Sequence, residues 1–139
     1  MKSKLPVTVA ASLGVAAGTL AVPLASAHHA FSAEYDLNKP LALKGVLTKI
    51  QWVNPHSWVY IDVKNSDGSV TNWAVEFGAV AALRRRGLQR SDLPIGLEVT
   101  VKGYQAKTGK AVVNAASVQL PDGRDLYAGD PNGPDAPPQ

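Results

Sequence analysis

The chain has 139 residues, no cysteine and one methionine, which suits a single domain and excludes a disulfide framework. Its formal charge is +3, but Lys2 and Lys4 lie in a leader that we predict to be removed. That removal leaves 12 Lys and Arg against 11 Asp and Glu, a net charge of +1. A mature chain this close to neutral has no general attraction for nucleic acid, so we expect no nucleic-acid partner.

The first 27 residues follow the pattern of an export signal. A positive start at Lys2 and Lys4 precedes the apolar run VTVAASLGVAAGTLAV, and Ala25-Ser26-Ala27 offers small residues for cleavage. A retained membrane anchor is the alternative, but the run is short for a span of roughly 20 residues. We therefore predict a periplasmic or secreted protein that begins at His28 and has no stable membrane insertion after cleavage.

Three segments follow the leader. Residues 28–40 lack clear periodicity and are expected to form an N-terminal arm. Residues 41–128 alternate apolar and polar side chains in several runs and form the predicted domain. Residues 129–139, GDPNGPDAPPQ, have almost nothing apolar to bury, so this tail is expected to be disordered.

Five strands are predicted within the domain, at 41–53, 56–64, 70–77, 96–106 and 110–123. Apolar parity changes around Gly45, with Leu41 and Leu43 on one side and Val46 and Ile50 on the other, which suggests a bulge or bend there. A short helix is expected at 79–86, ending at Gly87. Three strands, a helix and two strands predict an all-β fold, a small OB-fold-like barrel. A generic five-stranded sheet with one helix is the alternative.

The second and third strands should form a hairpin around Ser66-Asp67-Gly68. A two-residue turn at Asp67-Gly68 would mix buried and exposed faces. A three-residue loop with Gly68 left-handed instead pairs Ile61 with Trp73 and Val59 with Val75. The same register places Trp58 opposite Glu76 and Tyr60 opposite Ala74 on the outer face.

Histidine is the residue type that most suggests chemistry, because neutral imidazole is the commonest metal ligand among side chains. The chain has three histidines: His28, His29 and His56. Cleavage after Ala27 would give His28 a free amine, so one residue would offer two nitrogen ligands. A nitrogen-rich set of this kind favours Cu(II) in the Irving–Williams order.

Two copper geometries are open. In one, His28 supplies its amine and ring and His56 adds a third nitrogen, as in a histidine brace. In the other, the amine of His28, the next amide and the ring of His29 chelate the ion locally. Glu34, Tyr35 or Asp36 could add a weak oxygen ligand in either case. The alternative without metal is that these histidines are solvated or hydrogen-bond a turn.

An aromatic face offers a second kind of site. Trp58 and Tyr60 share parity with His56, and Glu76 lies opposite Trp58 in the predicted hairpin. OB barrels bind ligands on such faces by aromatic stacking. The other reading is that Phe31 and Tyr35 of the arm pack over this face, which would carry the amino terminus toward His56.

No hydrolase signature is present: the sequence lacks G-x-S-x-G, H-E-x-x-H, a P-loop and a cysteine nucleophile. We therefore expect a binding module for a metal ion or small ligand rather than an enzyme, with any protein partner unidentified. An oxidase or oxygenase built on a histidine brace is the further alternative.

Several segments together resemble a family of small exported bacterial proteins of unknown function. They are HHAFSAEYD, KPLALKGVLTKIQWVNPHSWVYIDV, NWAVEFG, LRRRGL and GLEVTVKGY. The resemblance rests on a His-His-x-Phe start and a W-x-N-P-H-x-W segment. It implies an exported single domain, with no established activity, substrate or cofactor. The matching positions are His28, His29, Phe31, Trp52, Asn54, Pro55, His56 and Trp58.

Overall fold

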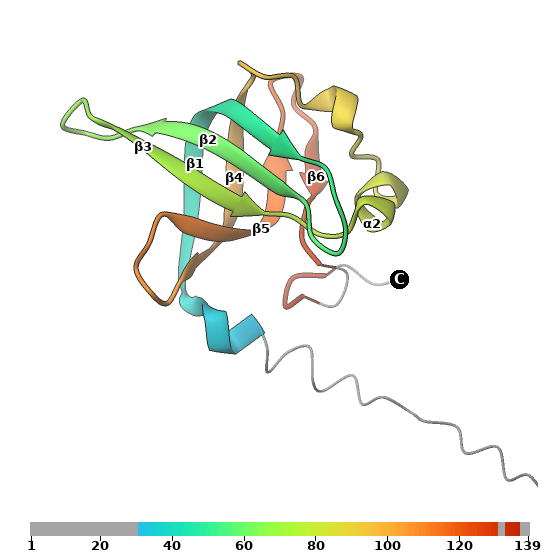
Figure 1. Cartoon of the computed structure of the whole chain (residues 1–139), viewed down its shortest axis with the longest axis horizontal. Coiled ribbons are helices and arrows are strands. Elements are labelled where there is room, and N and C mark those ends of the chain that lie inside the picture. Colours follow the sequence, from blue (N-terminus) through green and yellow to red (C-terminus); the bar gives the residue numbers. More distant parts are fainter. Residues whose placement is uncertain (1–30, 131–132, 137–139) are drawn as a thin grey trace, which may run out of the picture.

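A computed structural model describes residues 31–130 and 133–136. Within them, six strands and two short helices follow a helical turn at residues 31–34 (Figure 1). None of the described helices is long and apolar enough to cross a membrane. The elements are β1 (Tyr35–Gln51), β2 (Trp58–Lys64), β3 (Val70–Glu76), α2 (Val80–Arg85), η1 (Arg90–Asp92), β4 (Glu98–Ala106), β5 (Val112–Gln119) and β6 (Asp125–Tyr127).

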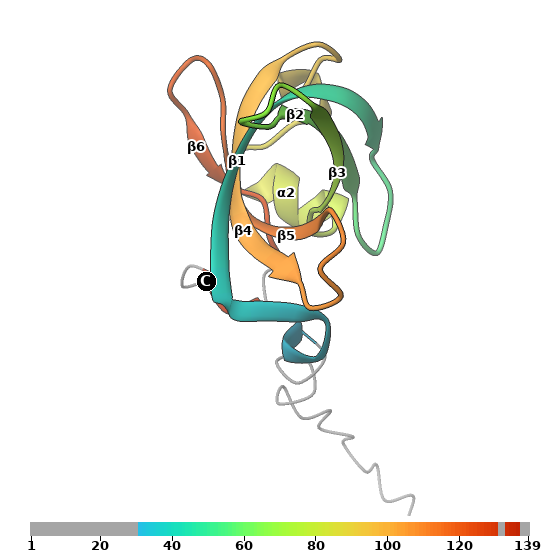
Figure 2. The ribbon, with the colours of Figure 1, turned by 90° about the vertical axis from the view of Figure 1, so that its left-hand side faces the viewer.

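Five of the strands close into a ring. The hydrogen-bonded order is β3-β2-β1-β4-β5, and a parallel pairing of β3 with β5 joins its two ends. Figure 2 looks into this ring, with α2 behind it. The closed order, with a helix between the third and fourth strands, confirms the predicted small OB-fold-like, barrel-shaped fold.

The interior of the ring is apolar and comes from every one of its strands. Alternating positions of each strand point inward, and helix α2 adds Leu83 at the end of the ring. Burial of these side chains supplies the main stabilisation in a chain without disulfides. The largest fully buried apolar side chains are Phe77, Leu47, Ile61, Leu83, Leu88, Leu93, Val59, Val75, Val101, Val113 and Val118.

The predicted β2–β3 hairpin is confirmed in detail. Ile61 pairs with Trp73 and Val59 with Val75, as the alternation of faces required. Gly68 has a φ of 87°, the left-handed conformation that the three-residue loop needs. The register therefore also places Trp58 opposite Glu76.

Strand β1 differs from the prediction in two ways. It begins at Tyr35 rather than Leu41, so residues 35–40 of the predicted arm belong to the strand, and Tyr35 and Pro40 pair with β4. The bulge predicted at Gly45 instead lies between Leu47 and Lys49. Val46 is consequently exposed and Leu47 buried. Gly45 has a different role, because a Cβ there would lie 2.7 Å from the carbonyl oxygen of Asp62 on β2.

The C-terminal part of the chain holds an element that the sequence reading missed. Strand β6 extends the sheet beyond β5, and the chain then turns back toward the end of β3. Residues 129–130 and 133–136, which belong to the segment predicted to be disordered, are placed against the domain. Gly129 is buried there.

Candidate functional site

His56 lies in the loop that joins β1 to β2 and contacts the carboxylate of Glu76. The contact runs from the imidazole Nδ1 to Glu76 Oε1. An ionised carboxylate only accepts hydrogen bonds, so Nδ1 carries the proton here. In the neutral ring, Nε2 then bears the lone pair. Glu76 thus fixes both the tautomer and the direction of the ring.

Glu76 is itself held from its other side by the first residue of β1. The hydroxyl of Tyr35 donates to Glu76 Oε2, so both carboxylate oxygens have a partner. Both side chains are deeply buried, Tyr35 being 5% exposed and Glu76 6%. Burial, followed by the hydrogen bond to Glu76, raises the pKa of Tyr35 well above its ordinary value. Tyr35 therefore stays a neutral donor throughout the physiological range.

The start of the described chain packs on this tyrosine. The ring of Phe31 lies 5.2 Å from that of Tyr35 and 6.0 Å from that of Tyr104, the latter edge-on. Aromatic pairs at these separations are favourable contacts. Phe31 is therefore connected to His56 through Tyr35 and Glu76, by one ring contact and two hydrogen bonds.

A fourth group, Asp130, approaches the opposite side of the imidazole. Its Oδ2 lies 3.8 Å from His56 Nε2. The backbone of Asp130 is fixed, because its carbonyl accepts hydrogen bonds from the Tyr127 hydroxyl at 2.6 Å and the Gly133 amide at 2.8 Å. The imidazole thus lies between two carboxylates, one on each ring nitrogen.

Backbone hydrogen bonds hold these loops together. The amide of Phe77 donates to Ser57, next to His56, and the amide of Gly78 donates to Ala128, two residues before Asp130. The crossing is tight enough to require glycine, since a Cβ on Gly78 would lie 2.4 Å from the carbonyl oxygen of Gly129. Hydrogen bonds therefore connect the end of β3 both to the loop at 56–57 and to the segment after β6.

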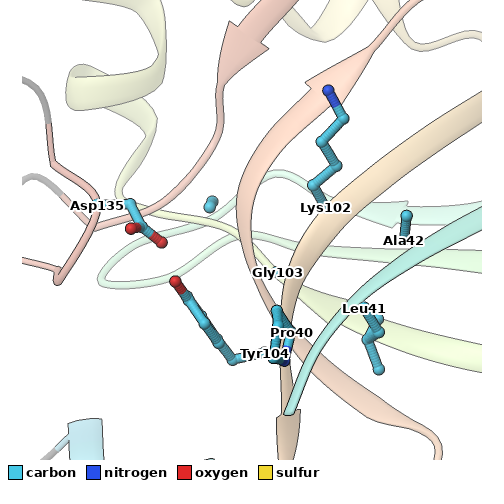
Figure 3. Close-up of a pocket in the computed structure, with 8 residues that line it drawn as sticks. Pro40, Leu41, Ala42, Lys102, Gly103, Tyr104 and Asp135 are labelled. Atoms are coloured by element: carbon cyan, nitrogen blue, oxygen red, sulfur yellow. The ribbon is translucent and has the colours of Figure 1, made fainter. Parts of the chain in front are cut away.

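A pocket of about 360 Å³ lies on the outside of the ring, where β1 and β4 meet the C-terminal segment. Figure 3 shows the Tyr104 hydroxyl directed at the Asp135 carboxylate across this pocket. The hydrogen bond to Asp135, together with burial, raises the pKa of Tyr104 to about 12. The C-terminal segment is thus attached to the domain at Asp135 as well as at Asp130.

The predicted aromatic face has its own internal contacts. The Tyr60 hydroxyl donates to Gln51 at 2.9 Å, and the Lys49 ammonium lies 5.1 Å from the centre of the Tyr60 ring. Trp58 is half-buried opposite Glu76. Glu76 points its carboxylate to Tyr35 and His56, so the structure joins it to the histidine. Ligand binding by Trp58 and Tyr60 stays a prediction.

The predicted metal ligands are divided between the described and undescribed parts of the chain. His56 is placed as above, whereas His28 and His29 lie outside the described residues. Within residues 31–130 and 133–136, no three His, Asp or Glu side chains are arranged to hold a metal ion together. A metal site at His56 therefore requires ligands from beyond the described residues.

The sequence does not predict a role for Asp130, and it suggests a different role for Tyr35. Tyr35 was a possible weak ligand, whereas its hydroxyl holds Glu76. Asp130 was assigned to a disordered tail because its neighbours are glycine and proline. Glu76 did carry a signal: it is an acidic residue between Val75 and Phe77, two side chains that are fully buried.

In a comparison with known proteins, residues 16–115 match a family of unknown function designated DUF6152. The chain belongs to this family. The DUF6152 range includes Tyr35, His56 and Glu76 and ends before Asp130. It confirms membership of a family of unknown function, while export and both motifs, His-His-x-Phe and W-x-N-P-H-x-W, stay predictions. No curated protein matches the chain.

Proposed function

We propose that this DUF6152 protein is exported, is cleaved after Ala27 and binds one Cu(II) ion. The ligands are the amine and imidazole of His28 and Nε2 of His56, with His29 as an alternate or additional ligand. The observation that carries this proposal is the contact of His56 Nδ1 with buried Glu76.

The surroundings of His56 match those of histidines that ligate metals. Such histidines donate their second ring N–H to a carboxylate or carbonyl, which fixes the ring and raises its basicity. Glu76 is the carboxylate here, and Tyr35 orients it in turn. A histidine that served only the turn would not need a buried carboxylate with both oxygens occupied.

Only a short stretch of chain would join the proposed amino terminus to Phe31. Residues 28–30 can span at most about 10 Å before Phe31, at 3.3–3.6 Å per residue. Phe31 packs directly on Tyr35, the residue that holds Glu76. The packing of Phe31 therefore connects the proposed amino terminus to Tyr35, and the proposal requires the His28 nitrogens to reach Nε2 of His56 from there.

Nitrogen donors favour copper over the other divalent ions. A primary amine and two imidazoles bind Cu(II) more strongly than Zn(II) in the Irving–Williams order. The sequence offers no thiolate, because it contains no cysteine, so a soft-ligand site is excluded. The expected complex is a T-shaped or tetragonal Cu(II) centre with three nitrogen ligands.

Copper titration of the exported, purified protein tests this function. Intact mass should first show a chain that starts at His28. Calorimetry should then give one Cu(II) per chain, and electron paramagnetic resonance (EPR) should show nitrogen hyperfine structure. An added alanine before His28 should weaken binding by much more than tenfold, because it moves the amine away from the imidazole.

Variants of the other histidines separate the two geometries. His56→Ala should lower the affinity by more than the 10–100-fold typical of losing an outer-shell partner, while His29→Ala should have a smaller effect. Unchanged affinity in His56→Ala would refute the three-nitrogen site and favour local chelation by His28 and His29. A mature chain that starts elsewhere, or takes up no copper, would refute the function itself.

A further inference from the structure

The segment that follows β6 brings a carboxylate to the side of His56 where the proposed metal would bind. Asp130 Oδ2 lies 3.8 Å from Nε2, while Nδ1 is already taken by Glu76. The sequence separates His56 from Asp130 by most of the domain, so only the fold brings them together. We infer that Asp130 is an oxygen ligand of the same ion, an inference that rests on the proposed copper site.

The separation of the two atoms suits a shared ion. With metal–nitrogen and metal–oxygen bonds of about 2.0–2.2 Å, two ligand atoms lie about 2.9 Å apart at a right angle and about 4.2 Å apart when opposite. The observed 3.8 Å falls between these limits.

The backbone of Asp130 is already positioned for this role. Its carbonyl is held by the Tyr127 hydroxyl and the Gly133 amide. Two residues earlier, Ala128 accepts a hydrogen bond from Gly78 and donates one to Ala116. Little further ordering is then needed when the carboxylate binds a metal, which lowers the entropic cost of recruiting it.

Charge also favours the assignment. An amine and two imidazoles are neutral ligands, so Cu(II) bound only by them keeps its full positive charge. Glu76 contacts Nδ1 of His56, so its negative charge would act on the ion only through the imidazole. A second carboxylate in direct contact would reduce that charge further. The ion would then fasten the C-terminal segment to the loop that carries His56.

A second acidic residue of the same segment provides the matched control. Asp135 bonds to Tyr104 on the outer pocket. Among the described residues, the acidic partners of His56 are Glu76 and Asp130. Asp130→Asn and Asp135→Asn each remove one negative charge from the C-terminal segment. Only the first removes the proposed ligand, so a general charge effect would appear in both variants.

The test measures Cu(II) alone, by calorimetry and EPR, on the mature wild type and the two variants. Asp130→Asn should lower the affinity at least about tenfold, the lower limit for loss of an outer-shell partner, and should shift g∥ and A∥. Asp135→Asn should leave both unchanged. Hydrogen exchange should show copper-induced protection of residues 128–130 in the wild type but not in Asp130→Asn.

The outcomes separate this inference from the proposed function. If Asp130→Asn matches the wild type in affinity and EPR spectrum, Asp130 is no ligand, and the nitrogen site stands. If the wild type binds no copper, both proposals fail. A melting temperature measured without copper shows whether Asp130→Asn is folded, and Asp130→Glu, which keeps a carboxylate, should retain part of the affinity if the oxygen is a ligand.

Discussion

Removal of the Tyr35 hydroxyl tests whether the buried Glu76 depends on its partners. Tyr35→Phe deletes one oxygen atom and keeps the ring that packs on Phe31. Glu76 Oε2 then loses its donor in a place that water hardly reaches, since Glu76 is 6% exposed. The variant should fold but be less stable, because a buried carboxylate with an unsatisfied oxygen is costly.

The size of the loss follows from the kind of hydrogen bond. A bond to a charged group contributes about 1.5–3 kcal/mol. For a domain of roughly 110 residues, the unfolding entropy at the midpoint converts this into a drop of about 6–13 °C in melting temperature. The folded pKa of Tyr35 is raised, so the hydroxyl is intact at neutral pH and the loss should not depend on pH between about 6 and 8.

Thermal unfolding of the copper-free protein, followed by circular dichroism at pH 7, measures the effect. Tyr60→Phe is the control, because the Tyr60 hydroxyl donates to Gln51 on the exposed side of the sheet. Its loss should stay within about 0.5 kcal/mol, as for other surface changes. Equal melting temperatures for Tyr35→Phe and wild type, or equal losses in both variants, would refute the role assigned to Tyr35.

Two further predictions concern the fold. The Asp92 carboxylate accepts hydrogen bonds from the Gln89 amide and from Arg124, which hold its pKa below the ordinary value. Asp92→Asn should therefore lower the free energy of unfolding by about 0.5–1 kcal/mol at pH 7. Urea unfolding should show this difference vanishing as the pH falls below about 4, where the carboxylate becomes protonated. Gly103→Ala should lower the free energy of unfolding by about 3 kcal/mol or more, because its Cβ would lie 2.0 Å from the Asn114 carbonyl oxygen. Gly68→Ala, with open space around it, should lower it by only about 1 kcal/mol. Equal losses in the two variants would contradict the argument from close approach.

The fold was predictable from the sequence wherever buried and exposed side chains alternate along a strand. The hairpin register followed from keeping Ile61, Trp73 and Val75 on one face, and the structure has that register. The same reasoning placed the change of parity in β1 at Gly45 instead of at the true bulge beside Thr48. Glycine marks a close approach as readily as a bulge, and the sequence alone cannot show that the Asp62 carbonyl lies behind it.

The site was predictable only in part, because its geometry depends on long-range contacts. His56 and Glu76 were each identified, but for different sites, since the sequence does not show which way a side chain at the end of a strand turns. Asp130 gave no signal, because glycine and proline around it are typical of disorder. What fixes Asp130 is the crossing of Gly78 and Gly129, which neither segment specifies alone.

The two ends of β1 explain why these residues meet at all. Tyr35 begins the strand and holds Glu76, while the loop after Gln51 carries His56 to the same carboxylate. A straight strand of 17 residues would keep its ends about 50 Å apart. Both ends reach one side chain because β1 coils around the ring, with register shifts after Tyr35 and beside Thr48. The Tyr35–Glu76–His56 chain is thus a product of ring closure, so a variant that opens the ring should lose the site before it loses the strands.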